Sequence, residues 1–164
     1  MSVTARSREA TPTPQKGAKV RRGDLAGIDA TTSDAIAVFC FVDQRPLKGV
    51  AGYLDWRLCG ALSRAIESGR FRCEPGEVML LPATGRIRDK RIFAFGLGRV
   101  QDATAEAFAK VGRTAIEVTG RAGVAELALA APRSSRRPEL EVEFVRAVES
   151  RSAARVGCVL VEEL

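Results

Sequence analysis

The chain has 164 residues, 46% of them hydrophobic and 28% charged, a composition typical of one globular domain with a buried core and not of a disordered or disulfide-rich protein. The formal net charge is +6 and histidine is absent, which excludes Ser-His-Asp and Cys-His catalysis and zinc sites that need histidine. The longest apolar runs, near Ala35–Val42 and Val78–Pro82, are far shorter than the roughly 20 residues of a membrane span, and no signal-peptide pattern opens the sequence, so a soluble cytoplasmic protein is expected.

The basic character is concentrated at the N-terminus. The segment Met1–Gly23 has six lysines and arginines against Glu9 alone, which accounts for +5 of the net charge of +6. It is rich in Ser, Thr and Pro and has almost nothing to bury, so it is predicted to be a disordered basic tail before a domain over residues 24–164. We interpret the tail as a solubilising leader. The alternative is an arm that contacts nucleic acid, acidic lipid or an acidic partner.

Strand and helix patterns then alternate. The run AIAVFCFV, which begins at Ala35, predicts a central strand buried on both faces. Apolar residues at helical spacing from Val50 to Ile66 predict one amphipathic helix of about five turns. Two short apolar strands, Glu77–Pro82 and Arg91–Phe95, flank a polar turn and predict a hairpin.

The second half continues the alternation. A second helix capped by Asp102 or Thr104 is followed by the buried strand Glu126–Ala131. A third helix, for which Pro138 suits the first turn, is followed by the final strand Val156–Val161. This order predicts an α/β fold with a mostly parallel mixed sheet and helices on both faces, a three-layer α/β/α arrangement.

The cysteines and the rare aromatic residues give no sign of a catalytic or metal centre. Cys40, Cys59, Cys73 and Cys158 are too scattered for a zinc or dithiol motif, and we interpret them as reduced, mostly buried thiols. No metal or cofactor is therefore expected.

Tyr53 and Trp56 are the sole tyrosine and tryptophan, and both lie in the first predicted helix. A helix that covers a sheet normally buries such side chains. We therefore assign both to the core or to an interface, in preference to stacking on a nucleic-acid base.

Three stretches of the sequence resemble a known family. They are PLKGVAGYLDWRLCG at Pro46–Gly60, GEVMLLPATGR at Gly76–Arg86 and IFAFGLGR at Ile92–Arg99. They are similar to the N-terminal domain of the leucyl aminopeptidase (cytosol aminopeptidase) family, over about Asp34–Pro132 and more loosely to Leu164. The resemblance implies a macro-domain-like fold without catalytic residues, in a domain that contributes to oligomer architecture.

In that family a separate catalytic domain binds two metal ions through acidic residues in a stretch resembling NTDAEGR. No such stretch occurs in this sequence. We therefore predict that the chain is not an enzyme, that it has no catalytic or metal-binding residue, and that it is a stand-alone relative of the N-terminal domain.

A more distant similarity is to ADP-ribose-binding macro domains. Gly23–Asp24–Leu25 resembles the Gly-Asp-Ile that opens many of them, which implies that Asp24 corresponds to the aspartate that holds adenine. The sequence departs from the macro pattern where Asn-Ala-Ala-Asn and a Gly-rich phosphate loop are replaced by Phe39–Asp43 and Leu47–Gly52.

Two loops have residues suited to an anion. One contains two glycines between a strand and a helix, where backbone N–H groups and the helix dipole can face a ligand, although two such glycines more often form a tight turn. The other is a run of arginines and serines ahead of the third helix. We interpret it as a solvated basic loop, and binding of a phosphate is the alternative. The candidate anion- or nucleotide-binding residues are Asp24, Gly96, Gly98, Arg99, Arg133, Ser134, Ser135, Arg136 and Arg137.

Three functional hypotheses follow. The first is a non-catalytic binding or assembly module that self-associates or docks on a full-length aminopeptidase, and it predicts exposed apolar surface on the first helix. The second is a sensor of a nucleotide or ADP-ribose-like anion, and it predicts that the two loops meet at one concave end of the sheet. The third is nucleic-acid contact through the tail, with a steep dependence on salt.

Overall fold

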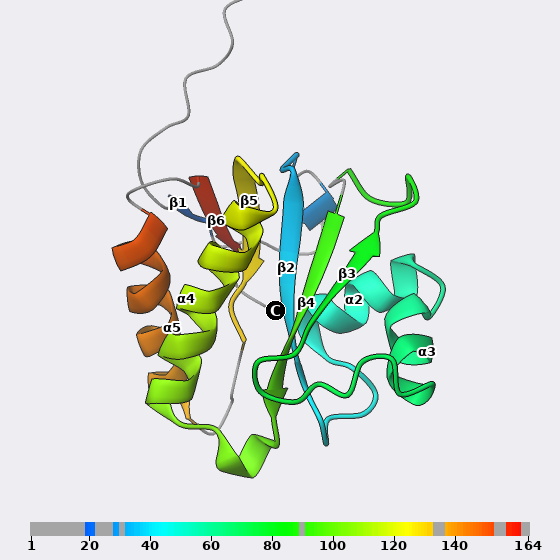
Figure 1. The fold of residues 1–164 in the computed structure, drawn as a ribbon, viewed down its shortest axis with the longest axis horizontal. Helices are drawn as coiled ribbons and strands as arrows, with labels where there is room; N and C mark the ends of the chain where they lie inside the picture. Colours follow the sequence, from blue (N-terminus) through cyan, green and yellow to red (C-terminus); the bar gives the residue numbers. More distant parts are fainter. Residues whose placement is uncertain are drawn as a thin grey trace, which may run out of the picture.

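The computed structural model describes residues 19–21, 28–29, 32–88, 91–132, 137–152 and 157–161, and its elements follow the predicted order (Figure 1). In chain order they are β1 (Lys19–Arg21), β2 (Ala35–Phe41), α2 (Gly49–Arg57), α3 (Ala61–Glu67), β3 (Val78–Pro82), β4 (Arg91–Gly98), the short 3-10 helix η1 (Val100–Asp102), α4 (Ala105–Arg121), β5 (Glu126–Ala130), α5 (Pro138–Ser152) and β6 (Gly157–Val161).

The sheet confirms the predicted α/β class. Its strand order is β1-β6-β5-β2-β4-β3, and all neighbours are parallel except β3, which pairs antiparallel with β4 as the predicted hairpin. Strand β2 lies between β5 and β4, and all seven of its residues are buried. A strand covered on both faces needs such a continuous apolar run.

Helices cover both faces of the sheet, as the three-layer prediction requires (Figure 1). Helices α4 and α5 pack over one face, where Phe144 contacts Phe39 edge-to-face with ring centroids 4.9 Å apart. Helices α2 and α3 pack over the other, where Leu54 and Leu62 are buried with Phe71. The two apolar clusters share β2, whose side chains alternate between them.

The first helix is not continuous, which corrects the prediction of one helix from Val50 to Ile66. Helix α2 ends at Arg57 and α3 begins at Ala61, because the chain turns through left-handed backbone at Cys59 (φ 54°) and Gly60 (φ 79°). The helical apolar spacing continues across the break. Periodicity therefore could not reveal it.

Two predicted boundaries also change. Lys19–Arg21, which composition placed in the disordered tail, form β1 and pair in parallel with β6, with Lys19 opposite Val159. The rest of Met1–Gly23 lies outside the described residues, as does Asp24. Strand β4 continues through Gly96 to Gly98 instead of ending at Phe95. Within the described ranges, no helix is both long and apolar enough to cross a membrane.

Candidate functional site

The predicted glycine turn lies at the C-terminal end of β4, but its N–H groups are already in use. Gly96 N donates to Glu77 O at 2.9 Å and Gly98 N donates to Cys73 O at 2.9 Å. Gly98 O in turn accepts a hydrogen bond from Val42 N at 2.8 Å. These groups join β4 to its neighbouring segments and do not point at an open anion site.

Close packing explains why both positions are glycine. A Cβ at Gly96 would lie 2.1 Å from Glu74 O and 2.5 Å from Cys73 C, and one at Gly98 would lie 2.9 Å from Pro75 Cγ. Gly98 also has φ 77°, which side chains rarely adopt. The two glycines let the loop over residues 73–75 lie directly against β4.

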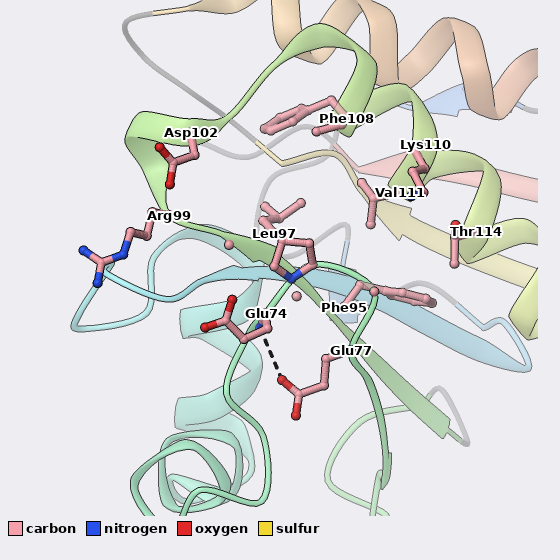
Figure 2. Close-up of a pocket in the computed structure, with 15 residues that line it drawn as sticks. Glu74, Glu77, Phe95, Leu97, Arg99, Asp102, Phe108, Lys110, Val111 and Thr114 are labelled. Atoms are coloured by element: carbon pink, nitrogen blue, oxygen red, sulfur yellow. Dashed lines mark hydrogen bonds between the residues drawn. The ribbon is translucent and has the colours of Figure 1, made fainter.

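A groove of about 360 Å³ lies between that loop and α4 (Figure 2). Phe95 and Leu97 of β4 line its base, and Phe108 and Val111 line the α4 side. Charged residues of both signs surround it, namely Glu74, Glu77, Arg99, Asp102 and Lys110. The groove brings together residues that are far apart in the sequence and belong to no motif, so sequence reasoning found only its glycines and Arg99.

One of those carboxylates has a structural role. Glu77 Oε2 accepts hydrogen bonds from Arg72 N at 2.8 Å and Glu74 N at 3.2 Å, and the second bond is drawn in Figure 2. Glu77 Oε1 also lies 3.8 Å from Arg72 Nε. Glu77 therefore holds the turn that forms one wall of the groove.

The second predicted loop is described at one of its five candidate residues. Arg133, Ser134, Ser135 and Arg136 lie outside the described residues, whereas Arg137 precedes α5. Arg137 Nη1 donates to Ala103 O at 2.7 Å, and Nη2 donates to Val100 O at 2.9 Å. Arg137 thus lies beside η1, which directly follows Gly96–Arg99, so the one described candidate residue of the second loop approaches the first loop there.

The same turn is also joined to β2. Asp43 follows β2, and its Oδ1 accepts a hydrogen bond from Val100 N at 3.0 Å. The loops that follow β2 and β4 and the residue that precedes α5 therefore meet at the C-terminal end of the parallel strands, where open α/β sheets usually bind ligands.

Arg137→Ala is expected to lower the free energy of unfolding by about 1–2 kcal/mol, because two carbonyl groups lose a charged donor. Urea unfolding followed by circular dichroism measures the change. Among the described residues, exposed Arg146 of α5 bonds only Glu143, so Arg146→Ala is the control, with an expected loss below about 0.5 kcal/mol. Equal losses in both variants would show that the bonds of Arg137 do not stabilise this turn.

Two buried thiols lie beside an arginine near the groove. Cys40 and Cys73 are both buried, and Arg45 Nη2 donates to Cys73 Sγ at 3.6 Å. The pKa of Cys73 is lowered because its sulfur accepts hydrogen bonds from Cys40 and from Arg45. The pKa of Cys40 is raised because it bonds Cys73 and is buried. Core packing of Cys40 is confirmed, whereas Cys59 is exposed and the side chain of Cys158 lies outside the described residues.

The two aromatic residues of helix α2 differ in their exposure to solvent. Trp56 is 71% exposed, so a place in the core is wrong for it, whereas the interface interpretation and its alternative, stacking on a nucleic-acid base, both stay open. Tyr53 is half-buried, with its ring centroid 6.0 Å from that of Trp56. Partial burial and a hydrogen bond to Asp29 raise the pKa of Tyr53. Arg57, next to Trp56, lies 3.7 Å from Asp29 and donates to Arg86 O at 2.7 Å.

Comparison of the fold with solved structures shows which class of domain this is. Solved structures with the same fold include a mutant of tomato leucine aminopeptidase, with a TM-score of 0.63 and 15% identity over 94% of this chain and 34% of that one. They also include the macrodomain of Oceanobacillus iheyensis with ADP, with a TM-score of 0.65 and 16% identity over 87% of this chain and 80% of that one. The domain is therefore macrodomain-like.

The sequence then identifies the family. Residues 36–154 match the N-terminal domain of the cytosol aminopeptidase family, and the chain belongs to that family. A probable cytosol aminopeptidase of Cupriavidus taiwanensis is 34% identical over 90 residues, which are 55% of this chain and 17% of that protein. The chain thus matches less than a fifth of the length of such relatives, in the non-catalytic N-terminal domain. The resemblance found in the sequence is confirmed.

Proposed function

We propose that the chain is a non-catalytic assembly module of the cytosol aminopeptidase family, and that it self-associates through a contact surface centred on Trp56. The observation that carries the proposal is the 71% exposure of the indole on α2. The opposite side of the same helix packs Val50, Ala51 and Leu54 into the core. Trp56 therefore points away from the domain, where the hydrophobic effect favours covering it.

The surroundings of Trp56 are suited to an interface. Tryptophan is among the residues that contribute most to protein interfaces, particularly when neighbours exclude water around it. Tyr53 lies beside the indole, and Arg57 is held in place by Asp29 and by Arg86 O. An aromatic centre with a polar rim is the usual composition of such a contact.

The family supports the same function. The relatives are several times longer than the match, so this domain is one part of a longer chain in them and has neighbouring domains to contact. A full-length aminopeptidase is the alternative partner for the Trp56 surface. The absence of a peptidase activity in this chain is part of the proposal, because the match lies in the N-terminal domain and the sequence has no stretch resembling NTDAEGR.

Trp56→Lys is expected to convert the assembly to a monomer, because a charge replaces the apolar centre of the contact. Light scattering coupled to gel filtration measures the mass. Val142→Lys is the matched control, because Val142 is also an exposed apolar residue (55%) but lies on α5, over the opposite face of the sheet. A mass that is unchanged by Trp56→Lys, or reduced equally by both variants, would contradict the proposed surface.

A second candidate function is the binding of a nucleotide or ADP-ribose-like anion. It is supported by the approach of Arg137 to the turn after Gly98 and by the likeness of the fold to a macrodomain solved with ADP. Against it, the N–H groups of Gly96 and Gly98 and the guanidinium of Arg137 already have protein partners. Calorimetry with ADP-ribose and ATP tests it, and heat of binding to a monomer would favour this function over assembly.

A further inference from the structure

Strand β3 forms one edge of the sheet and has backbone groups directed outward. It pairs only with β4 in the described part of the chain. Gly96 N donates to Glu77 O, so by the antiparallel alternation Met79 and Leu81 bond to β4. The N–H and C=O groups of Val78 and Leu80 therefore point away from the sheet, as does the C=O of Pro82.

A groove of about 420 Å³ runs between this edge and α3. Leu80 and Pro82 line it from the strand, and Leu58 and Ala61 line it from the helical side. The side chain of Leu80, like that of Val78, is on the face of the sheet that α4 and α5 cover. It is 54% exposed, because those helices lie over the other end of that face. An unpaired strand edge next to apolar surface is the feature to which extended peptides bind by adding a strand.

The groove is also basic. Arg64 and Arg70 line it, and none of the described residues in its lining is a carboxylate. Arg64 Nη1 donates to Cys59 O, and Arg70 Nε donates to Ser68 Oγ at 3.1 Å. Neither guanidinium forms an ion pair with a described residue. Each guanidinium has five N–H donors, so most of them are available to an acidic ligand.

The two arginines favour an acidic peptide over a second copy of this chain as the partner of the β3 edge. If two copies of the chain paired through β3 in antiparallel fashion, a twofold axis perpendicular to the sheet would place both α3 helices on the same face. Arg64 and Arg70 of the two copies would then gather beside one another, which like-charge repulsion disfavours. An extended peptide with acidic side chains has the opposite charge and uses the same backbone groups.

We propose that the edge of β3 and the groove beside α3 bind an extended acidic peptide as an added strand. Alternate side chains of such a strand face opposite sides of the sheet. Acidic side chains on one side meet Arg64 and Arg70, and apolar side chains on the other side meet Leu80. Trp56 is not among the residues that line the groove, and the proposal does not depend on self-association.

The test uses the capped peptide Val-Glu-Val-Glu-Val and its Val-Gln-Val-Gln-Val counterpart, with affinity measured by amide chemical-shift titration of the full chain. The Glu peptide is expected to bind at least tenfold more tightly and to slow hydrogen exchange at the Val78 and Leu80 amides. A Glu peptide with N-methylated backbone amides is expected to lose binding at least tenfold. Equal affinity of the Glu and Gln peptides, or no binding of either, would overturn the proposal.

Variants separate this site from general attraction to a basic protein. Arg70→Gln is expected to weaken binding of the Glu peptide severalfold, whereas Arg121→Gln, at the exposed end of α4, is expected to leave it unchanged. If both variants weakened binding of the Glu peptide equally, its affinity would depend only on the net charge of the protein and not on this groove. Binding that is unaffected by N-methylation, without protection of Val78 and Leu80, would likewise rule out strand addition. Trp56→Ala, which removes the indole without adding a charge, is expected to leave peptide affinity unchanged, so the peptide site and the assembly surface are tested separately.

Discussion

Gly96→Ala is expected to lower the free energy of unfolding by about 3 kcal/mol or more. The added Cβ would lie 2.1 Å from Glu74 O and 2.7 Å from Cys73 O, and both are backbone atoms with no side-chain freedom to move aside. Cys73 O is also held by Gly98 N at 2.9 Å. Relief of the clash therefore requires the loop over residues 73–75 to leave β4, and with it one wall of the groove beneath α4.

Urea unfolding followed by circular dichroism measures this loss. Gly120→Ala is the matched control, because Gly120 lies in α4 with nothing within 4 Å of the position of a new Cβ. Alanine in place of glycine within a helix is expected to raise stability there by about 0.5–1 kcal/mol. A Gly96→Ala protein as stable as wild type would show that the loop does not lie against β4 as described.

Asp55→Ala is expected to cost about 2–3 kcal/mol, because the side chain of Asp55 caps the start of α3. Asp55 Oδ1 accepts hydrogen bonds from Leu62 N at 2.9 Å and Ser63 N at 3.0 Å, and Oδ2 accepts one from Ser63 Oγ at 2.5 Å. A carboxylate at a helix N-terminus also interacts favourably with the helix dipole. Without it, the two N–H groups lose their acceptor and α3 loses its anchor to α2.

Two milder variants separate the hydrogen bonds through which Asp55 stabilises the protein. Ser63→Ala removes only the hydroxyl bond and is expected to cost about 1 kcal/mol. Asp55→Asn keeps an oxygen acceptor for the two N–H groups and is expected to fall between Ser63→Ala and Asp55→Ala. Thermal unfolding of the three variants gives the order. If Asp55→Ala cost no more than Ser63→Ala, the carboxylate would not be the cap of α3.

The features of the fold that depend on local pattern could be predicted from the sequence. The apolar run from Ala35 gives β2, and Pro138 begins α5. Thr104 caps α4, where its Oγ1 accepts a hydrogen bond from Ala107 N at 3.1 Å. Each of these signals involves residues that are neighbours in the chain. Local physical chemistry is sufficient to identify them.

The features that were missed depend on distant contacts. Apolar spacing predicts one long helix through Asp55, and nothing in the immediate sequence of Asp55 shows that it caps a second helix beyond Gly60. Lys19–Arg21 become a strand because β6, far along the chain, offers an edge. The exposure of Trp56 likewise depends on which side of α2 faces the sheet, and apolar spacing alone assigned it to the core or an interface.

The candidate site likewise combines features that the local sequence predicts with features that depend on distant contacts. Gly96, Gly98 and Arg99 drew attention because the sequence pattern placed them between a strand and a helix; the two glycines belong to β4, and all three residues line a groove. The reason for the two glycines is the loop over residues 73–75, which approaches from a different part of the chain. Arg137 was a candidate anion ligand in a loop otherwise interpreted as a solvated basic loop, yet its described partners are the carbonyls of Val100 and Ala103. The types of these residues indicated where a site could lie, whereas what each residue contacts became clear only from the structure.

The most direct test of the central claim is the fluorescence of Trp56, the sole tryptophan, measured as the protein is diluted. In the assembly the indole is covered, so its emission is expected to be blue-shifted and protected from iodide quenching. On dilution to the monomer, emission should shift to the red and quenching should rise to that of an exposed indole, in step with the loss of mass by light scattering. A monomer at all concentrations, with constant emission and quenching, would contradict self-association through Trp56.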